Sequence, residues 1–296
     1  MNLASPSSSS PANGPPDAGD QKKSDSPAES SSSRRSLFSR LFLRLEGQSP
    51  SRPQSLFNGL LVGGVIAGFF ILTFLTLDYT PRWNLLWLYR EKVLSGFVNT
   101  LAISGIALVL SLIIGLATAL SSRSRLIPLV TFGRMYIGLI RNTPLMVQII
   151  ILFYVVGTAL NITNRYLVGA LILACFSGAY VSEIIRAGIE SIPASQIESG
   201  QSLGFTRFQL YRFVILPQVA KRITPGIAGQ LVSLVKDSSL LSIIAVSEVT
   251  KVVQEIDSLN YATIETFIQL AGLYLLITLP LSALAKMLER RFAYEN

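Results

Sequence analysis

The stretch that decides the fold reads IESGQSLGFTRFQLYRFVILPQ, from Ile197 to Gln218. It is polar at its start, apolar and aromatic later, and carries a proline one residue before its end. The chain around it is apolar, since 50% of its 296 residues are hydrophobic, 14% are charged and the mean hydropathy is +0.50. Soluble domains carry about 25% charged residues. The composition therefore indicates a membrane protein, in which this polar stretch is expected outside the bilayer.

Two short helices joined by a glycine corner are predicted here. The sequence SQIE at 195–198 fits a capping box, in which the serine hydroxyl accepts from a backbone N–H and the glutamate reaches back. Gly204 suits the left-handed position beyond a helix end, and TRFQ at 206–209 fits a second capping box. Pro217 is expected to end the second helix, and TP at 224–225 to cap and begin the next one.

The first of these helices is about 12 Å long, too polar to span a membrane and too well capped for a flexible linker. Two interpretations follow from the residues alone. The helix docks in a groove of a partner, or it rests as an amphipathic helix on lipid.

Composition also excludes several classes of chemistry. The chain has no histidine and a single cysteine, Cys175, so no disulfide forms within it and the commonest metal ligand is missing. It has no phosphate-binding loop of the G-x-x-x-x-G-K-[ST] type, so any ATP is expected on another chain. The net charge of +8 is attributed to cytoplasmic loops rich in Lys and Arg, not to nucleic acid binding.

The sequence predicts an all-α membrane protein with about six transmembrane helices, because a span needs about 20 apolar residues. The third candidate is too long for one straight span and contains RNTP at 141–144, so we expect a bent helix. The fifth is interrupted by KDSS at 236–239. The candidates are 57–77, 97–120, 126–157, 166–186, 225–246 and 266–285.

Residues 1–56 are rich in Ser, Pro and Gly, and we expect a disordered cytoplasmic tail that buries too little apolar surface to fold. Within it, SLFSRLFLRL at 36–45 is basic and amphipathic, a surface helix or a plain anchor before the first span. With the N-terminus inside, the inner segments hold more Lys and Arg than the outer ones. The excess predicts that both termini are cytoplasmic, which places the loop at about 187–224 in the cytoplasm.

The loop resembles that of permease subunits of ATP-binding cassette (ABC) importers, which reads E-A-A, three residues, G, nine residues, I-x-L-P. Glu198, Gly204, Leu216 and Pro217 match, while Ser199, Gly200 and Val214 replace the alanines and the isoleucine with residues of similar size. RNTPLMVQ at 141–148 resembles the R-G-T-P-L-x-V-Q stretch of the polar amino acid branch, with Asn142 in place of glycine. AYVSE at 179–183 and KDSSL at 236–240 also resemble that branch, and the resemblance covers about 92–292.

The resemblance implies a five-helix type I importer core at 92–292, preceded by an extra N-terminal helix at 57–77. It implies a multi-pass protein of the bacterial plasma (inner) membrane that is not itself an enzyme and binds no cofactor. Two permeases, identical or homologous, would form the pore, two ATPase subunits would bind ATP and Mg, and an extracytoplasmic solute-binding protein would deliver the amino acid. The coupling helix would contact the ATPase through Ser195, Glu198, Ser199, Gly200, Leu203 and Gly204.

Ionisable groups within spans are costly unless they are paired or face water, and they are candidates for a solute pathway. A zwitterionic amino acid needs donors for its carboxylate and acceptors for its ammonium group. Structural roles stay open beside this one: Glu183 pairing with Arg186, Lys236 and Asp237 pairing with other charges, and Arg134 reaching an interface. The candidate pathway residues are Arg141, Thr143, Met146, Gln148, Tyr180, Glu183, Lys236, Asp237 and Ser238.

Two rival functions remain at this point. An ion-driven secondary transporter also uses broken helices and buried charges, but it gives no reason for capped cytoplasmic helices. A membrane scaffold that docks a cytoplasmic partner would explain the loop and leave the intramembrane charges unexplained.

Overall fold

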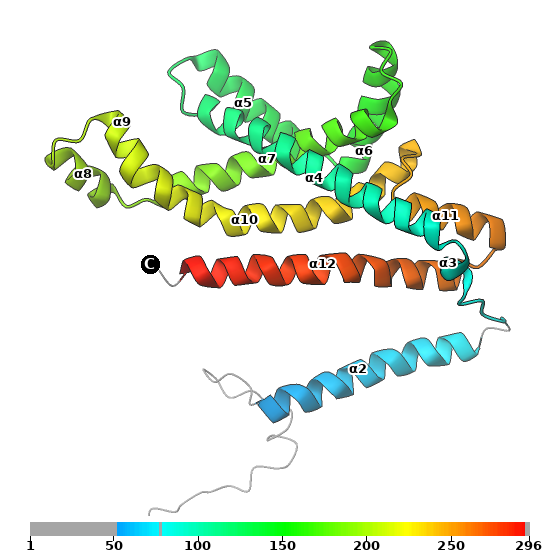
Figure 1. Cartoon of the computed structure of the whole chain (residues 1–296). Coiled ribbons are helices and arrows are strands. Elements are labelled where there is room, and N and C mark those ends of the chain that lie inside the picture. Colours follow the sequence, from blue (N-terminus) through cyan, green and yellow to red (C-terminus); the bar gives the residue numbers. More distant parts are fainter. Residues whose placement is uncertain (1–51, 77–78, 294–296) are drawn as a thin grey trace, which may run out of the picture. The chain divides into compact units, whose positions relative to one another are not determined.

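The computed structural model describes residues 52–76 and 79–293, and every regular element in this part of the chain is a helix (Figure 1). The chain divides into two compact units, Met1–Tyr79 and Thr80–Asn296, and each is considered by itself. Most of the predicted tail and the basic stretch at 36–45 lie outside the described residues.

The first unit contributes one long helix, α2 (Arg52–Leu75). It begins five residues before the predicted span at 57–77. Its 24 residues correspond to about 36 Å at 1.5 Å per residue, enough to cross a bilayer. None of its described side chains is buried, and apolar residues lie on all of its faces, as expected for a helix in lipid.

The second unit holds all the other helices, which Figure 1 traces from cyan to red. Three irregular helical stretches, called η1 to η3, join regular helices: η1 and η2 are π-helical and η3 is a 3₁₀ helix. In chain order the elements are α3 (Leu85–Leu88), α4 (Arg90–Ser121), α5 (Ile127–Arg141), α6 (Leu145–Ile150), η1 (Ile151–Gly157), α7 (Arg165–Glu190), α8 (Ala194–Ser202), α9 (Arg207–Gln209), η2 (Leu210–Ile215), α10 (Leu216–Asp237), η3 (Ser238–Ile244), α11 (Val249–Asn260) and α12 (Thr263–Ala293).

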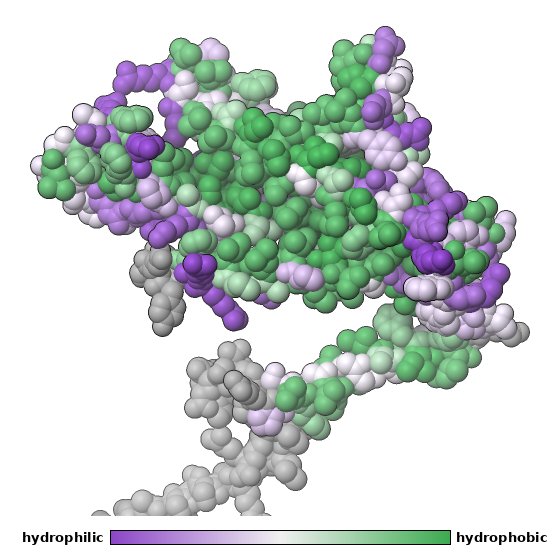
Figure 2. All heavy atoms as spheres, in the orientation of Figure 1, coloured by the Kyte–Doolittle hydropathy of each residue, from purple (hydrophilic) through white to green (hydrophobic). Residues whose placement is uncertain are grey.

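Five described helices are long and apolar enough to span a membrane, and the bent pair α5 and α6–η1 makes a sixth. In the face that Figure 2 shows, hydrophobic residues cover the middle of the second unit and hydrophilic residues gather towards its two ends. This is the distribution of a multi-pass membrane protein, and it confirms the predicted all-α fold with about six spans.

The core of the second unit forms where α4 packs along α7. Gly115 of α4 permits the close approach, because a Cβ there would stand 2.5 Å from Cγ1 of Val181. Small residues at helix contacts are typical of membrane proteins. Fully buried Ile149, Leu173 and Leu241 join α6, α7 and η3 to the same core.

The predicted bend in the third span is confirmed. α5 and α6–η1 meet at 110°, and Pro144 occupies the N-cap of α6 with an extended backbone. Gln148 holds the corner, since its Nε2 donates to the carbonyl oxygens of Ile140 at 2.9 Å and Thr143 at 3.1 Å. A buried amide thereby satisfies carbonyls that the break leaves without helical partners.

Two predicted helix ends were wrong. Pro217 lies in the first turn of α10, and Pro225 lies inside α10, so that one helical path runs from Arg207 to Ile244. Pro217 is accommodated because the preceding turns, η2, are π-helical, and local widening is one way in which membrane helices absorb proline. Thr224 is an interior residue, and its hydroxyl donates to the carbonyl of Ala220.

The interruption predicted at 236–239 is present as a change of helix type, from α10 to η3 at Asp237 and Ser238. The amphipathic helix α11 was not predicted at all. It buries Val249, Val252, Val253 and Ile256, too short an apolar set to be found in a search for spans.

Candidate functional site: the coupling loop and the charged corner

Helix α8 begins at Ala194, directly after Pro193 at its N-cap. The capping box predicted from Ser195 and Glu198 is therefore wrong. Ser195 lies in the first turn, where helical backbone angles keep its hydroxyl away from the N–H groups that an N-cap residue reaches. No side chain caps this helix end, and the fixed φ of Pro193 helps to define it.

The end of α8 is formed as predicted by Gly204, whose φ of +78° lies in the left-handed region that glycine adopts without steric cost. The N–H of Gly204 donates to the carbonyl of Gln201 at 2.9 Å, and the N–H of Phe205 donates to that of Gly200 at 3.1 Å. These two bonds define a Schellman motif, which reverses the chain sharply after the helix.

The second capping box is confirmed. Thr206 accepts from the N–H of Gln209 at 3.3 Å, and the N–H of Thr206 donates to Oε1 of Gln209 at 2.8 Å. The chain thus re-enters a helix at Arg207, three residues beyond Gly204, and this helix continues through η2 into α10.

Helix α8 is attached to the long helical path by packing as well as by the corner. Leu210 lies against Gly200, where a Cβ would stand 2.6 Å from Cδ1 of the leucine. Gln218 donates through Nε2 to Oε1 of Gln196 at 2.6 Å. A buried cluster fills the space between the elements and consists of Ile192, Leu210, Ile215 and Val219, with Ile197 packed against it.

The face of α8 turned away from this cluster is open. Glu198 and Ser199 are exposed, and Leu203 keeps 76% of its surface. A shallow hollow of about 400 Å³ lies beside α8. Its lining includes four of the six predicted coupling residues, and the full set is Ser195, Gln196, Ser199, Gly200, Leu203, Phe205, Val214 and Gln218. An exposed apolar tip beside a hollow is a surface suited to a partner protein.

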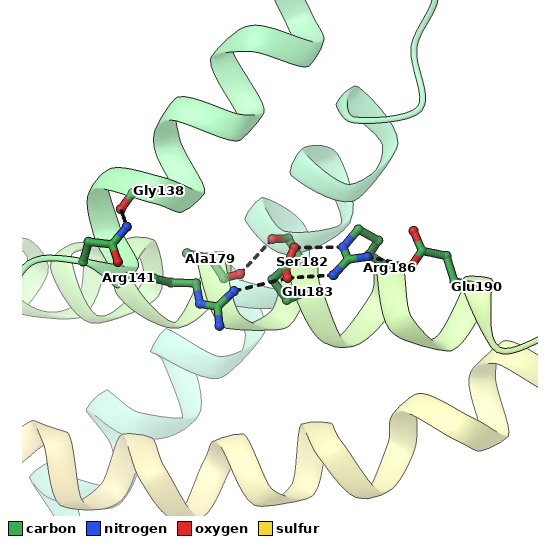
Figure 3. A network of polar contacts seen from close by, with 8 residues as sticks. Gly138, Arg141, Ala179, Ser182, Glu183, Arg186 and Glu190 are labelled. Atoms are coloured by element: carbon green, nitrogen blue, oxygen red, sulfur yellow. Dashed lines mark hydrogen bonds and ion pairs between the residues drawn. The ribbon is translucent and has the colours of Figure 1, made fainter.

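A second polar site lies where α5 ends against α7 (Figure 3). Arg141 donates through Nη1 to Oε2 of Glu183 at 3.2 Å, and its guanidinium lies 5.5 Å from the ring centre of Tyr180. Arg186 also binds Glu183, at 2.9 Å, so the predicted pairing of these two residues is present. We call Arg141, Tyr180 and Glu183 the charged corner; it offers a cation and an anion side by side.

The other predicted pathway residues are placed differently. Thr143 and Gln148 bind each other and the backbone at the bend, Oγ1 of Thr143 accepting from Nε2 of Gln148 at 2.8 Å. Met146 is exposed on α6.

The group at 236–238 contains one buried residue, Ser238, whose hydroxyl donates to the carbonyl of Val235. Lys236 is exposed and Asp237 is partly buried. Across residues 52–76 and 79–293 no ion pair joins either charge to another group. No hydrogen bond there connects this group with the charged corner.

Sequence reasoning missed a buried carboxylate at the start of α11. Glu248 is fully buried and caps this helix, accepting from the N–H groups of Thr250 at 2.9 Å and Lys251 at 2.7 Å, while the hydroxyl of Tyr274 donates to it at 3.1 Å. Burial raises the pKa of Glu248 to about 7, against the opposing effect of these hydrogen bonds. The signal in the sequence was a lone glutamate before an amphipathic repeat. In the part of the chain that the structure describes, no cluster of acidic or cysteine side chains could hold a metal.

Comparison with known proteins agrees with this architecture. Residues 111–294 match the family model described as the inner membrane component of binding-protein-dependent transport systems. The L-cystine transport system permease protein TcyB of Bacillus subtilis (strain 168) is 36% identical over 73% of this chain and 94% of its own length. The glutamine transport system permease protein GlnP of Escherichia coli (strain K12) is 32% identical over 71% of this chain and 96% of its own.

Solved structures show the same fold. A crystal structure of an amino acid ABC transporter with histidines contains a chain that is 33% identical, with a TM-score of 0.68, covering 72% of this chain and 100% of that one. A chain of the MetNI methionine ABC transporter in an inward-facing conformation has a TM-score of 0.58 at 15% identity, over 69% of this chain and 97% of its own. The family model and the two relatives show that the chain belongs to the family of inner membrane components of binding-protein-dependent transport systems, and they confirm its resemblance to the permeases of the polar amino acid branch.

Proposed function

We propose that this chain is the permease subunit of an ABC importer that moves polar or charged amino acids into the cytoplasm. Transport proceeds by alternating access, driven by ATP hydrolysis on separate ATPase subunits that hold ATP and Mg. The complex contains a second permease, identical or homologous, and an extracytoplasmic solute-binding protein. The protein lies in the bacterial inner membrane with both termini in the cytoplasm.

The observation that carries this proposal is the attachment of α8 to the helical path from Arg207 to Ile244. The C-terminal end of α8 is fixed by the Gly204 corner, and its buried face packs against Leu210. A hydrogen bond from Gln218 to Gln196 holds α8 to α10 as well. A partner that grips the exposed face of α8 therefore moves α10 directly. An ATPase whose subunits close on ATP supplies such a movement.

The charged corner is the proposed contact for the amino acid. The guanidinium of Arg141 suits the solute carboxylate and the carboxylate of Glu183 suits its ammonium group. The solute would replace their mutual contact of 3.2 Å with two contacts of its own. The corner thus recognises the zwitterionic group common to amino acids, and Lys236, Asp237 and Ser238 are proposed as a separate part of the pathway.

Reconstitution tests the function. The tagged chain is purified gently, its companions are identified, and the complex is placed in liposomes with a binding protein and labelled amino acids. The proposal expects co-purified ATPase, uptake that requires ATP, and competition by other polar amino acids.

Two outcomes of this experiment would contradict the importer function and point to another one. Uptake that persists without ATP under an ion gradient identifies a secondary transporter. A bound ATPase without any solute flux identifies a scaffold.

A further inference from the structure

Arg141 and Glu183 are the first two members of a row of charges that continues along α7 (Figure 3). Arg186 binds Glu183 at 2.9 Å and Glu190 at 2.6 Å, while Arg141 binds Glu183 at 3.2 Å. Glu183, Arg186 and Glu190 are three and four residues apart, so they share one face of the helix. We call Arg141, Glu183, Arg186 and Glu190 the charged ladder.

Each inner member of the ladder is shared between two partners. Oε2 of Glu183 accepts from Arg141 and from Arg186. Arg186 directs Nε and Nη2 to Glu183 and Nη1 to Glu190. A charged solute that binds Arg141 and Glu183 therefore weakens the Glu183–Arg186 pair and strengthens the pairing of Arg186 with Glu190.

The far end of the ladder is the last residue of α7, next to the elbow that leads into α8. In that elbow the carbonyl of Ser191 accepts from Nη1 of Arg222 on α10 at 2.5 Å. Ile192 is buried in the cluster with Leu210 and Ile215. Glu190 thus adjoins the segment that joins α7, α8 and α10.

We propose that the charged ladder reports solute at the charged corner to the α7–α8 elbow, with Arg186 as the positioning residue. This inference rests on the proposed function. A zwitterion that takes Arg141 with its carboxylate and Glu183 with its ammonium group withdraws Glu183 from Arg186. The guanidinium of Arg186 then pairs with Glu190 alone. This shift moves the end of α7 and, through the α7–α8 elbow, changes the position of α8 against the ATPase.

The exposure of the ladder favours coupling over stability as its role. The side chains keep between 26% and 51% of their surface, and ion pairs this open are screened by salt and add little to folding. Loss of one member is therefore expected to leave the helices assembled.

The test uses the whole complex in liposomes, with ATPase, second permease and binding protein. We expect Arg186→Gln to keep basal ATP hydrolysis and to reduce stimulation by the loaded binding protein about tenfold. Arg186→Lys restores part of the stimulation, because it keeps the charge but lacks the planar fork that directs separate N–H groups to the two carboxylates. In the wild type stimulation falls with salt, and in Arg186→Gln it does not.

Arg125→Gln is the matched control, because Arg125 is an exposed arginine of the α4–α5 loop without an ion pair among the described residues. Full stimulation of ATP hydrolysis in Arg186→Gln would overturn the proposed role of the charged ladder. So would an equal fall in basal and stimulated hydrolysis, which marks a merely structural role. A wild-type complex without stimulation would overturn the proposed function first, and the ladder with it.

Discussion

Gln218 on α10 donates a hydrogen bond of 2.6 Å to Gln196 on α8, and so joins α8 to the helical path from Arg207 to Ile244 across 22 residues of sequence. Replacement of either residue by alanine removes this neutral hydrogen bond, about 0.5–1.5 kcal/mol, and Gln218→Ala also removes the bond from Nε2 to the carbonyl of Val214. We expect each variant to keep its assembled complex and lose part of the ATPase stimulation. In a double-mutant cycle the two losses should not add, because both remove the same bond. Additive losses would show that the bond does not transmit movement.

Gly204 is the position where backbone conformation alone sets the cost of substitution, because its φ is +78° and a Cβ would meet no atom within 4 Å. Gly204→Val should cost about 1–2 kcal/mol or more in the loop and lower transport-coupled ATP hydrolysis, with the spans still inserted. Gly204→Asn is the control, since asparagine tolerates this conformation. Equal transport-coupled ATP hydrolysis in both variants and the wild type would refute the role of the Gly204 corner in coupling.

Variants of Glu183 and Asp237 test the two parts of the proposed pathway separately. A hydrogen bond to a charged group contributes about 1.5–3 kcal/mol, so Glu183→Gln should reduce uptake about tenfold or more. Asp237→Asn should also reduce uptake, because Asp237 is proposed to line the pathway and an ionisable group within a span is costly to keep there. Uptake is measured in liposomes and assembly by gel filtration. Normal uptake by both variants would remove the proposed pathway.

Glu248 predicts a pH dependence of stability. Its pKa rises from an ordinary 4.5 to about 7 on folding, so the folded protein binds the proton more tightly than the unfolded chain. The contribution is fully present below about pH 4.5 and is lost as the pH rises through 7, a change of about 3 kcal/mol. Thermal melting in detergent between pH 5 and 8 should show this loss. Glu248→Gln should flatten it, whereas Glu255→Gln, on the exposed side of α11, should not.

Gly115 tests the packing of α4 on α7. A Cβ there would lie 2.5 Å from Val181 and 3.0 Å from the backbone nitrogen of Ser182, so Gly115→Ala must push the helices apart. Overpacking of this kind costs about 1–3 kcal/mol, read as a lower melting temperature in detergent. Gly105→Ala on the same helix, where the space is open, should melt like the wild type or slightly above it. Equal melting of the two variants would contradict the close approach.

Local chemistry predicted a large part of this structure. The spans follow from hydropathy, the bend from RNTP at 141–144, and the left-handed corner from Gly204, because each signal acts within a few residues. The errors at Pro217 and Pro225 have another origin. Whether a proline ends a helix depends on whether neighbouring turns widen and on what surrounds the carbonyls it leaves free, and these are properties of the packed molecule.

The site was predictable in its parts and not in its connections. Glu183 and Arg186 are neighbours on one helix, so their pairing could be anticipated. Arg141 arrives from another helix across 42 residues of sequence, and the packing of α5 against α7 brings it to Glu183. Gln148 drew attention as a polar group within a span, yet its Nε2 is occupied by hydrogen bonds at the bend itself. Glu248 escaped notice because a single buried carboxylate has no periodicity.

The continuous helical path from Arg207 to Ile244, which changes helix type at η2 and η3, also makes the number of residues along it important for geometry. Each residue of an α-helix turns the chain by about 100°. One residue inserted within this path would therefore rotate Lys236 and Asp237 relative to α8, while every local sequence motif stayed intact. Insertions beside Gly204 would only lengthen the hinge. The direction in which Lys236 and Asp237 point relative to α8 is therefore set by the number of residues between them. A change in that number should be far less tolerated within the path than beside Gly204.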